Sequence, residues 1–76
     1  MPSAYELADR ADMIVDGYAF ILQDGGVSVV NLYHTDRASF FLLDGTVIDT
    51  SMDDIEVDIA RDYLRRNKAF LEDDVA

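Results

Sequence analysis

The sequence contains no cysteine, no tryptophan and a single proline. The absence of cysteine excludes disulfide bonds, thiol catalysis and thiolate metal sites. The segment Met1–Glu6 has neither the basic nor the apolar region of a secretory signal. Long hydrophobic runs are also missing, because the longest ones, around residues 27–33 and 38–43, are the length of strands and too short to span a bilayer. We therefore expect a cytoplasmic protein without a membrane segment.

Basic residues are scarce. Six Lys and Arg stand against sixteen Asp and Glu, which gives a formal net charge of −10. Binding to nucleic-acid phosphates or to anionic membranes needs the opposite surplus, so we expect no direct nucleic-acid binding and no membrane binding. Half of the residues are hydrophobic, which is too many for a disordered acidic chain. The 76 residues predict one small folded domain, residues 1–76.

The residue pattern predicts a helix at each end of the chain. Ser3 and Glu6 form a capping box, and apolar residues at helical spacing continue to Val15, before a stop at Asp16-Gly17. A second helix is expected to follow Ser51 as its N-cap, with a wide apolar side and residues 72–76 fraying at its end. Its polar side carries a predicted ladder of charges at i, i+4 spacing, formed by Asp58, Asp62 and Arg66.

Four β-rich runs lie between these helices and form two predicted hairpins. The runs are Tyr18–Gln23, Val27–Tyr33, Ala38–Leu43 and Thr46–Thr50. Asp24-Gly25-Gly26 joins the first two, and Asp44-Gly45, a pair preferred in type I′ turns, joins the last two. We expect an α+β fold in which a four-stranded antiparallel meander is flanked by the two helices, in the order α-β-β-β-β-α.

Both faces of this predicted sheet are apolar. In the second hairpin, alternation places Phe41, Leu43 and Ile48 on one face and Phe40, Leu42 and Val47 on the other. The two helices can cover one face each, or they can both cover one face and leave the other to a second copy or a partner protein. We favour a homodimer or a complex, because large exposed apolar patches are rare on monomers and small domains lack core.

Groups that could support catalysis or bind a metal ion are few. His34, the single histidine, lies in a predicted turn near Asp36 and is interpreted as a surface residue rather than a general base. The Asp-rich turns lack the spacing of a calcium-binding EF-hand, and no serine stands in a Gly-x-Ser-x-Gly motif. We therefore predict no catalytic residue, metal, cofactor or small-molecule ligand, and a protein that is not an enzyme.

Two groups of polar residues are candidate sites. Glu56 and Asn67 lie eleven residues apart, and hence at nearly the same azimuth, within the apolar side of the second helix. They are interpreted as a buried polar pair that fixes helix docking or a dimer register, as a ligand contact through Glu56, or as solvated residues. Asp9, Asp12 and Asp16 form a predicted stripe on the outer side of the first helix, which would contact a basic partner or remain solvated.

These observations favour a small acidic protein–protein interaction module, either self-associating or bound to a partner through an apolar sheet face. The alternative is an acidic mimic of nucleic acid, such as a phage-type inhibitor that occupies the basic groove of a host nuclease. Either function suits a bacterial or phage protein. A mimic is expected to bind with a steep salt dependence, whereas apolar docking is expected to be nearly insensitive to salt.

Overall fold

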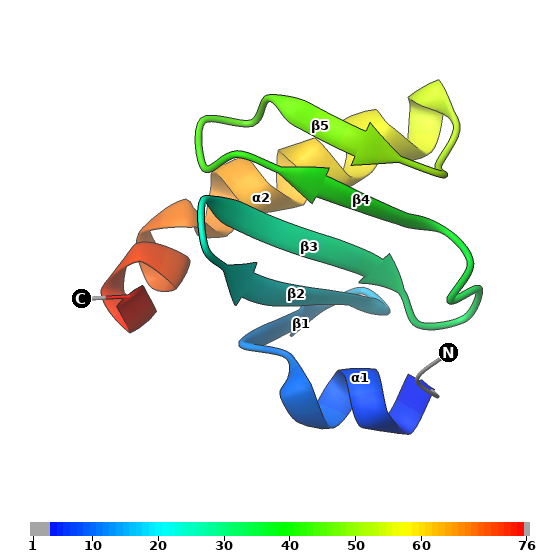
Figure 1. Cartoon of the computed structure of the whole chain (residues 1–76), viewed down its shortest axis with the longest axis horizontal. Coiled ribbons are helices and arrows are strands. Elements are labelled where there is room, and N and C mark those ends of the chain that lie inside the picture. The colour runs from blue at the N-terminus through cyan, green and yellow to red at the C-terminus, as the bar shows by residue number, and fades with distance from the viewer. Residues whose placement is uncertain (1–3, 76) are drawn as a thin grey trace.

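A five-stranded antiparallel sheet with a helix at each end forms the fold of the computed structural model, which describes residues 4–75 and the side chains of residues 5–71 (Figure 1). The elements are α1 (Ala4–Arg10), β1 (Met13–Val15), β2 (Tyr18–Gln23), β3 (Gly26–Asn31), β4 (Ala38–Phe41), β5 (Val47–Thr50) and α2 (Asp54–Val75). Each strand pairs with the next one along the chain, so the sheet is a simple meander. The predicted α+β class with two terminal helices is confirmed, and the sheet has five strands rather than the expected four.

The additional strand, β1, takes the place of the C-terminal half of the first predicted helix. α1 ends at Arg10, and β1 pairs antiparallel with residues 18–20. Asp16 and Gly17 form the turn between β1 and β2, with φ angles of 49° and 81°, as a two-residue hairpin turn of type I′ requires. The helix prediction was wrong here because this Asp-Gly pair closes a hairpin instead of ending a helix. Ser3, the predicted cap of α1, lies outside the described residues.

The β4–β5 turn is longer than the predicted Asp44-Gly45 turn of type I′. The Leu42 N–H donates to the Thr46 carbonyl (2.8 Å), and the Gly45 N–H donates to the Leu42 carbonyl (2.9 Å). Gly45 has a φ of 95°, whereas Asp44 does not have a positive φ, so the loop is a tight turn followed by a left-handed glycine. The Thr46 N–H donates to Asp44 Oδ1 (2.8 Å), and this hydrogen bond holds the pKa of Asp44 below its usual value.

A β-bulge between β4 and β5 changes which side chains share a face. Phe40 is paired with Asp49, but Phe41 is paired with Val47, so Ile48 is an extra residue in β5. Val47 therefore packs on the same side as Phe41, whereas simple alternation in a regular hairpin placed it with Phe40. The expected assignment of these side chains to the two faces was wrong, because strict alternation along a strand does not allow for the extra residue of a bulge.

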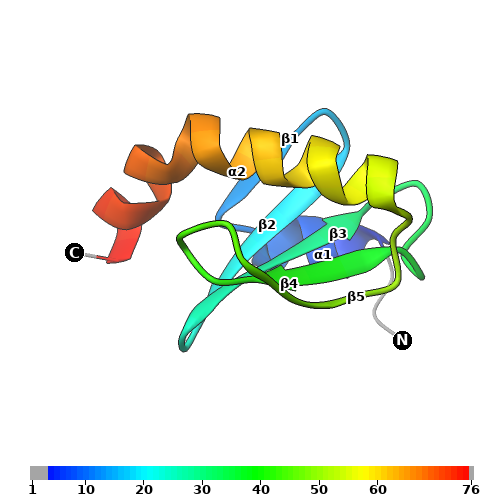
Figure 2. The same ribbon diagram turned by 90° about the horizontal axis from the view of Figure 1, so that it is seen from above.

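α2 packs across one face of the sheet, which we call the inner face (Figure 2). The core between them is formed by Phe20, Val27, Val29, Phe41, Met52, Val57, Ala60, Leu64 and Leu71. On the opposite, outer face, Ala19 and Val30 are buried, and α1 contacts β2 through a segment that contains the buried Leu7. One helix therefore lies on each face, but α1 has only seven residues and covers the β2 side of the outer face alone.

The N-terminus of α2 is capped by Asp53 rather than by the predicted Ser51. Asp53 Oδ1 accepts a hydrogen bond from the Glu56 N–H (2.8 Å), and the Asp53 carbonyl accepts one from the Val57 N–H (2.9 Å). Ser51 instead links β5 to the β3–β4 connection, because its Oγ donates to the Asp36 carbonyl (2.6 Å). Within the described residues, no helix is both long and apolar enough to cross a membrane.

Candidate functional site

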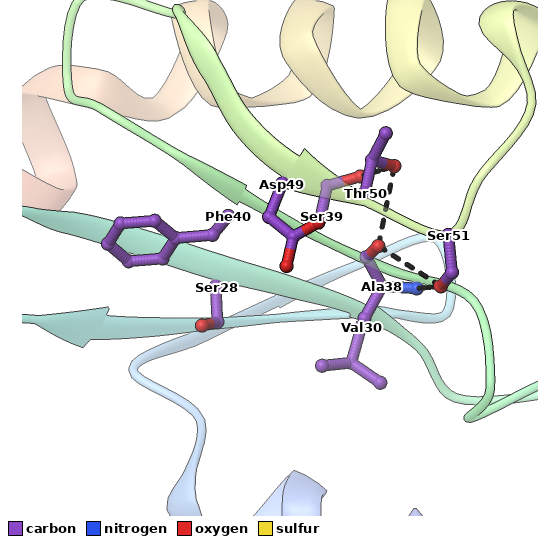
Figure 3. A pocket seen from close by; sticks show the side chains of 8 residues that line it. All are labelled: Ser28, Val30, Ala38, Ser39, Phe40, Asp49, Thr50 and Ser51. Carbon is purple, nitrogen blue, oxygen red and sulfur yellow. Dashed lines mark hydrogen bonds between the residues drawn. The ribbon is translucent and has the colours of Figure 1, made fainter.

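The outer face of β3, β4 and β5 carries an open depression of about 290 Å³ (Figure 3). It is lined by Ser28, Val30, Ala38, Ser39, Phe40, Asp49, Thr50 and Ser51. Figure 1, viewed from this side, shows no element of the described chain crossing in front of these strands. The depression therefore lies where the outer face is not covered by α1.

Apolar and polar groups are separated within this depression. Val30 and Ala38 supply apolar surface, and the ring of Phe40 is only half-buried. Ser28 lies opposite Phe40 on β3, and Asp49 lies opposite it on β5, so a hydroxyl, an aromatic ring and a carboxylate form a row across three strands.

Three of the lining residues carry hydroxyl groups that are already engaged within the chain. Ser39 Oγ and Thr50 Oγ1 are 2.6 Å apart, and Thr50 Oγ1 also accepts a hydrogen bond from the Met52 N–H (2.9 Å). Ser51 Oγ accepts a hydrogen bond from the Ala38 N–H (3.0 Å). By contrast, the Ser28 hydroxyl and the Asp49 carboxylate have no hydrogen-bond or ion-pair partner among the described residues. They are the polar groups here that remain available to a partner.

Glu56 is buried against the sheet and forms a polar cluster that we call the Glu56 cluster, composed of Tyr18, Asn31 and Glu56. Glu56 Oε2 accepts hydrogen bonds from the Tyr18 hydroxyl (2.8 Å) and from Asn31 Nδ2 (2.9 Å). Tyr18 and Asn31 are cross-strand partners on β2 and β3, so the carboxylate joins α2 to two strands at once. Oε1 of the same carboxylate is buried without a hydrogen-bond partner among the described groups.

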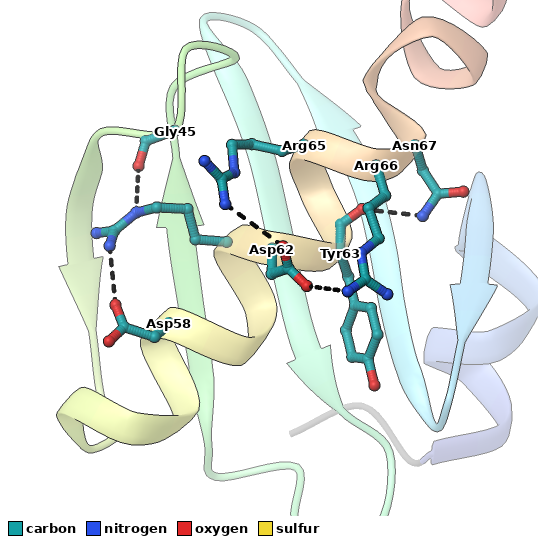
Figure 4. Close-up of polar contacts among 8 residues, drawn as sticks. Gly45, Asp58, Asp62, Tyr63, Arg65, Arg66 and Asn67 are labelled. Carbon is teal, nitrogen blue, oxygen red and sulfur yellow. Dashed lines mark hydrogen bonds and ion pairs between the residues drawn. The ribbon is translucent and has the colours of Figure 1, made fainter.

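Asn67 is not hydrogen-bonded to Glu56, although the two residues lie on the same side of α2. Asn67 Nδ2 donates to the Tyr63 carbonyl (2.9 Å), one turn earlier in the helix (Figure 4). Asn67 therefore satisfies its side-chain amide within its own helix. The buried partners of Glu56 therefore come from the sheet and not from the helix itself.

Asp9, Asp12 and Asp16 do not form a helical stripe, because α1 ends before two of them. Asp9 is exposed on α1, whereas Asp12 Oδ2 accepts a hydrogen bond from the Leu22 N–H (2.7 Å). Asp16 Oδ2 accepts one from the Tyr63 hydroxyl (2.7 Å), which raises the pKa of Tyr63. Two of the three carboxylates thus stabilise the fold of their own chain.

One pair of the predicted ladder of charges is present on the polar side of α2. Arg66 Nη2 lies 2.8 Å from Asp62 Oδ2, at the predicted i, i+4 spacing (Figure 4). Asp58 pairs instead with Arg61, with 3.1 Å between Arg61 Nη1 and Asp58 Oδ1. These exposed pairs are each expected to contribute less than about 1 kcal/mol to stability.

His34 lies exposed in the β3–β4 connection. Its backbone N–H donates to Asn31 Oδ1 (3.1 Å), and its carbonyl accepts from the Arg37 N–H (2.8 Å). Asn31 Oδ1 also accepts a hydrogen bond from the Tyr33 N–H (2.9 Å), so the amide that contacts Glu56 also orders this connection. Within the described part of the chain, no group of three or more His, Cys, Asp or Glu side chains is arranged to hold a metal ion.

Sequence reasoning did not single out Tyr18, Asn31 or Asp49. Asn31 stands between the apolar residues Val30 and Leu32, and this interruption was the signal that could have marked it as a partner of a buried group. Pairing it with Glu56 required the position of α2 on the sheet. Asp49 lies opposite Phe40 in a regular hairpin closed at Asp44-Gly45 as well as in the structure, so this neighbour could have been found by counting residues from the predicted turn.

The fold and its open depression define a small acidic α+β domain with one sheet face partly uncovered. The chain belongs to a family of unknown function, DUF7723, whose family model matches residues 1–71. Comparison with curated proteins and with solved structures gave no match.

The tyrosine of the Glu56 cluster makes stability depend on alkaline pH. Burial and the hydrogen bond to Glu56 raise the pKa of Tyr18 from 10.0 to about 12. An unfolded chain therefore releases this proton at lower pH than the folded one, so the contribution of Tyr18 to stability is present below pH 10 and is lost as the pH rises towards 12. Denaturant unfolding should show a steeper loss over this interval for the wild type than for Tyr18→Phe.

Tyr5→Phe is the matched control for this measurement, because the Tyr5 side chain is 86% exposed. We expect this variant to retain the wild-type dependence on pH. An equally steep loss in Tyr18→Phe would show that the Tyr18 hydroxyl does not contribute to the alkaline transition.

Proposed function

We propose that this protein is a small acidic, non-enzymatic protein–protein interaction module of the cytoplasm, and that it binds its partner through the outer face of β3, β4 and β5. The observation that carries this proposal is the half-buried Phe40 at an open depression on a sheet face that α1 covers only in part. Aromatic side chains in a partly apolar hollow are typical centres of protein interfaces. The inner face contributes nothing to docking, because α2 occupies it.

A nucleic-acid mimic has less support. A mimic needs carboxylates spaced along the surface and free to contact a basic groove. Asp12 and Asp16, which contribute most of the expected stripe, accept hydrogen bonds from their own chain. The steepness of the salt dependence separates the two functions, since a mimic depends on many charge contacts, whereas the outer depression is lined by a single charged residue and by apolar surface.

Selection from a random peptide library tests the proposed function without knowledge of the partner. The wild-type protein is immobilised, and Phe40→Ser protein is used in parallel as the matched control. We expect peptides that are enriched on the wild type and at least about tenfold less on Phe40→Ser, because aromatic anchors at interface centres contribute about 2 kcal/mol or more. Enrichment that is equal on both proteins, or absent from both, would contradict the proposal.

A further inference from the structure

We propose that the depression on the outer face receives a lysine or arginine side chain of a basic partner protein, with its stem against Phe40 and its charged group at Asp49. This inference rests on the proposed function and specifies the chemistry of its partner. It is carried by the position of a free carboxylate directly beside an accessible aromatic ring, in a depression that also presents the apolar side chains of Val30 and Ala38.

The row of Ser28, Phe40 and Asp49 has the geometry that such a side chain needs. Directly paired residues on neighbouring strands have Cβ atoms about 4.5–5.5 Å apart, so the Asp49 carboxylate and the Ser28 hydroxyl flank the Phe40 ring. Long basic side chains bury their methylene groups on apolar surface while the charged end makes polar contacts. A cation over the ring gains a cation–π interaction, and the neighbouring carboxylate accepts its hydrogen bonds.

The protein already uses a similar contact on its inner face. The guanidinium carbon of Arg61 lies 6.0 Å from the centroid of the Phe41 ring, and Arg61 Nε donates to the Gly45 carbonyl (2.9 Å). Phe40, the residue before Phe41, presents its ring to the outer face. There Asp49 lacks a basic partner among the described residues. The outer face therefore offers to a partner the kind of contact that α2 supplies within the chain.

Charge favours a basic partner over a second copy. Each copy carries a formal charge of −10, so two copies repel one another at low salt. Asp49 is the charged residue that lines the depression, so apposing two outer faces would bring like charges together. A basic protein would instead be attracted by the net charge and held by Asp49.

Amide chemical shifts provide the test, with Nα-acetyl-arginine methylamide as the probe and the uncharged citrulline analogue as its match. Asp49→Asn removes the carboxylate, and Asp24→Asn removes the same charge from the exposed β2–β3 turn. We expect saturable shifts at Ser28, Phe40 and Asp49 with the arginine probe. The apparent affinity should fall about three- to tenfold with citrulline or in Asp49→Asn, and should be nearly unchanged in Asp24→Asn.

Equal binding of the two probes, or equal loss in both variants, would overturn the inference, because either result would show that the depression does not recognise the basic group. A stable dimer of the isolated protein that Phe40→Ser dissociates would also overturn it, by showing that a second copy occupies the face. The proposed function is tested separately from this inference. It would stand if the selected peptides bound the outer face without any basic residue, and it would be contradicted if they bound elsewhere.

Discussion

Replacing Phe41 with alanine is expected to reduce the free energy of unfolding by about 3–5 kcal/mol, whereas the same change at Phe40 should cost about 1 kcal/mol or less. The two residues are adjacent in β4 and differ in the face that they occupy. Phe41 is completely buried between the sheet and α2, while Phe40 lines the open depression. Denaturant unfolding of Phe41→Ala and Phe40→Ala measures both effects.

This pair of variants tests the assignment of the two faces directly. A total stability of about 5–15 kcal/mol is usual for a small domain, so the loss at Phe41 would remove a large part of it. If Phe41→Ala does not fold, Phe41→Leu should still be more destabilised than Phe40→Leu. Similar losses at the two positions would contradict the claim that Phe40 lies outside the core.

Replacing Glu56 with alanine is expected to destabilise the fold by about 2–3 kcal/mol, since the Tyr18 hydroxyl and Asn31 Nδ2 would lose a shared charged acceptor. For a domain of this size, such a loss lowers the melting temperature by roughly 10 °C or more. Glu56→Gln should lose less, because its amide oxygen can still accept both hydrogen bonds. Thermal unfolding monitored by circular dichroism measures these differences.

Asp58→Ala is the control for this second prediction. It removes an exposed carboxylate from the same helix, together with the ion pair to Arg61, and should cost less than about 1 kcal/mol. A double-mutant cycle of Tyr18→Phe and Glu56→Ala should give a coupling energy of about 0.5 kcal/mol or more. Losses of the same size in Glu56→Ala and Asp58→Ala would show that the buried cluster does not fix α2 on the sheet.

The elements that were predicted correctly are those with a strong local signal. A turn was predicted at Asp24-Gly25-Gly26 between two β-rich runs, and Asp24-Gly25 joins β2 to β3 there, with Gly26 already paired to Gln23 as the first residue of β3. The long apolar side of α2 predicted its packing on the sheet, and Ala60, Leu64 and Leu71 are completely buried there. Ile55, Ile59 and Phe70, which were expected on the same side, are exposed, so the buried side is narrower than predicted. In both cases the sequence signal lies in a few neighbouring residues or in one clear helical period of apolar residues.

The features that could not be predicted depend on contacts between distant segments. Met13–Val15 fits a helical pattern taken alone, and it becomes a strand because β2 offers it a partner. The burial of Glu56 was among the open interpretations, but its partners lie 25 and 38 residues away and could be identified only from the sheet. The same holds for the outer depression, which is left open because α1 ends at Arg10 and covers only the β2 side of the face.

The central claim is that the outer face of β3, β4 and β5 is the docking surface, and the most direct measurement is the map of amide chemical shifts produced by the most strongly selected peptide. We predict that the largest changes fall on Ser28, Phe40 and Asp49, with little change along α2. Changes concentrated on α2, or on the exposed acidic residues of α1, would contradict this account and place the docking surface elsewhere.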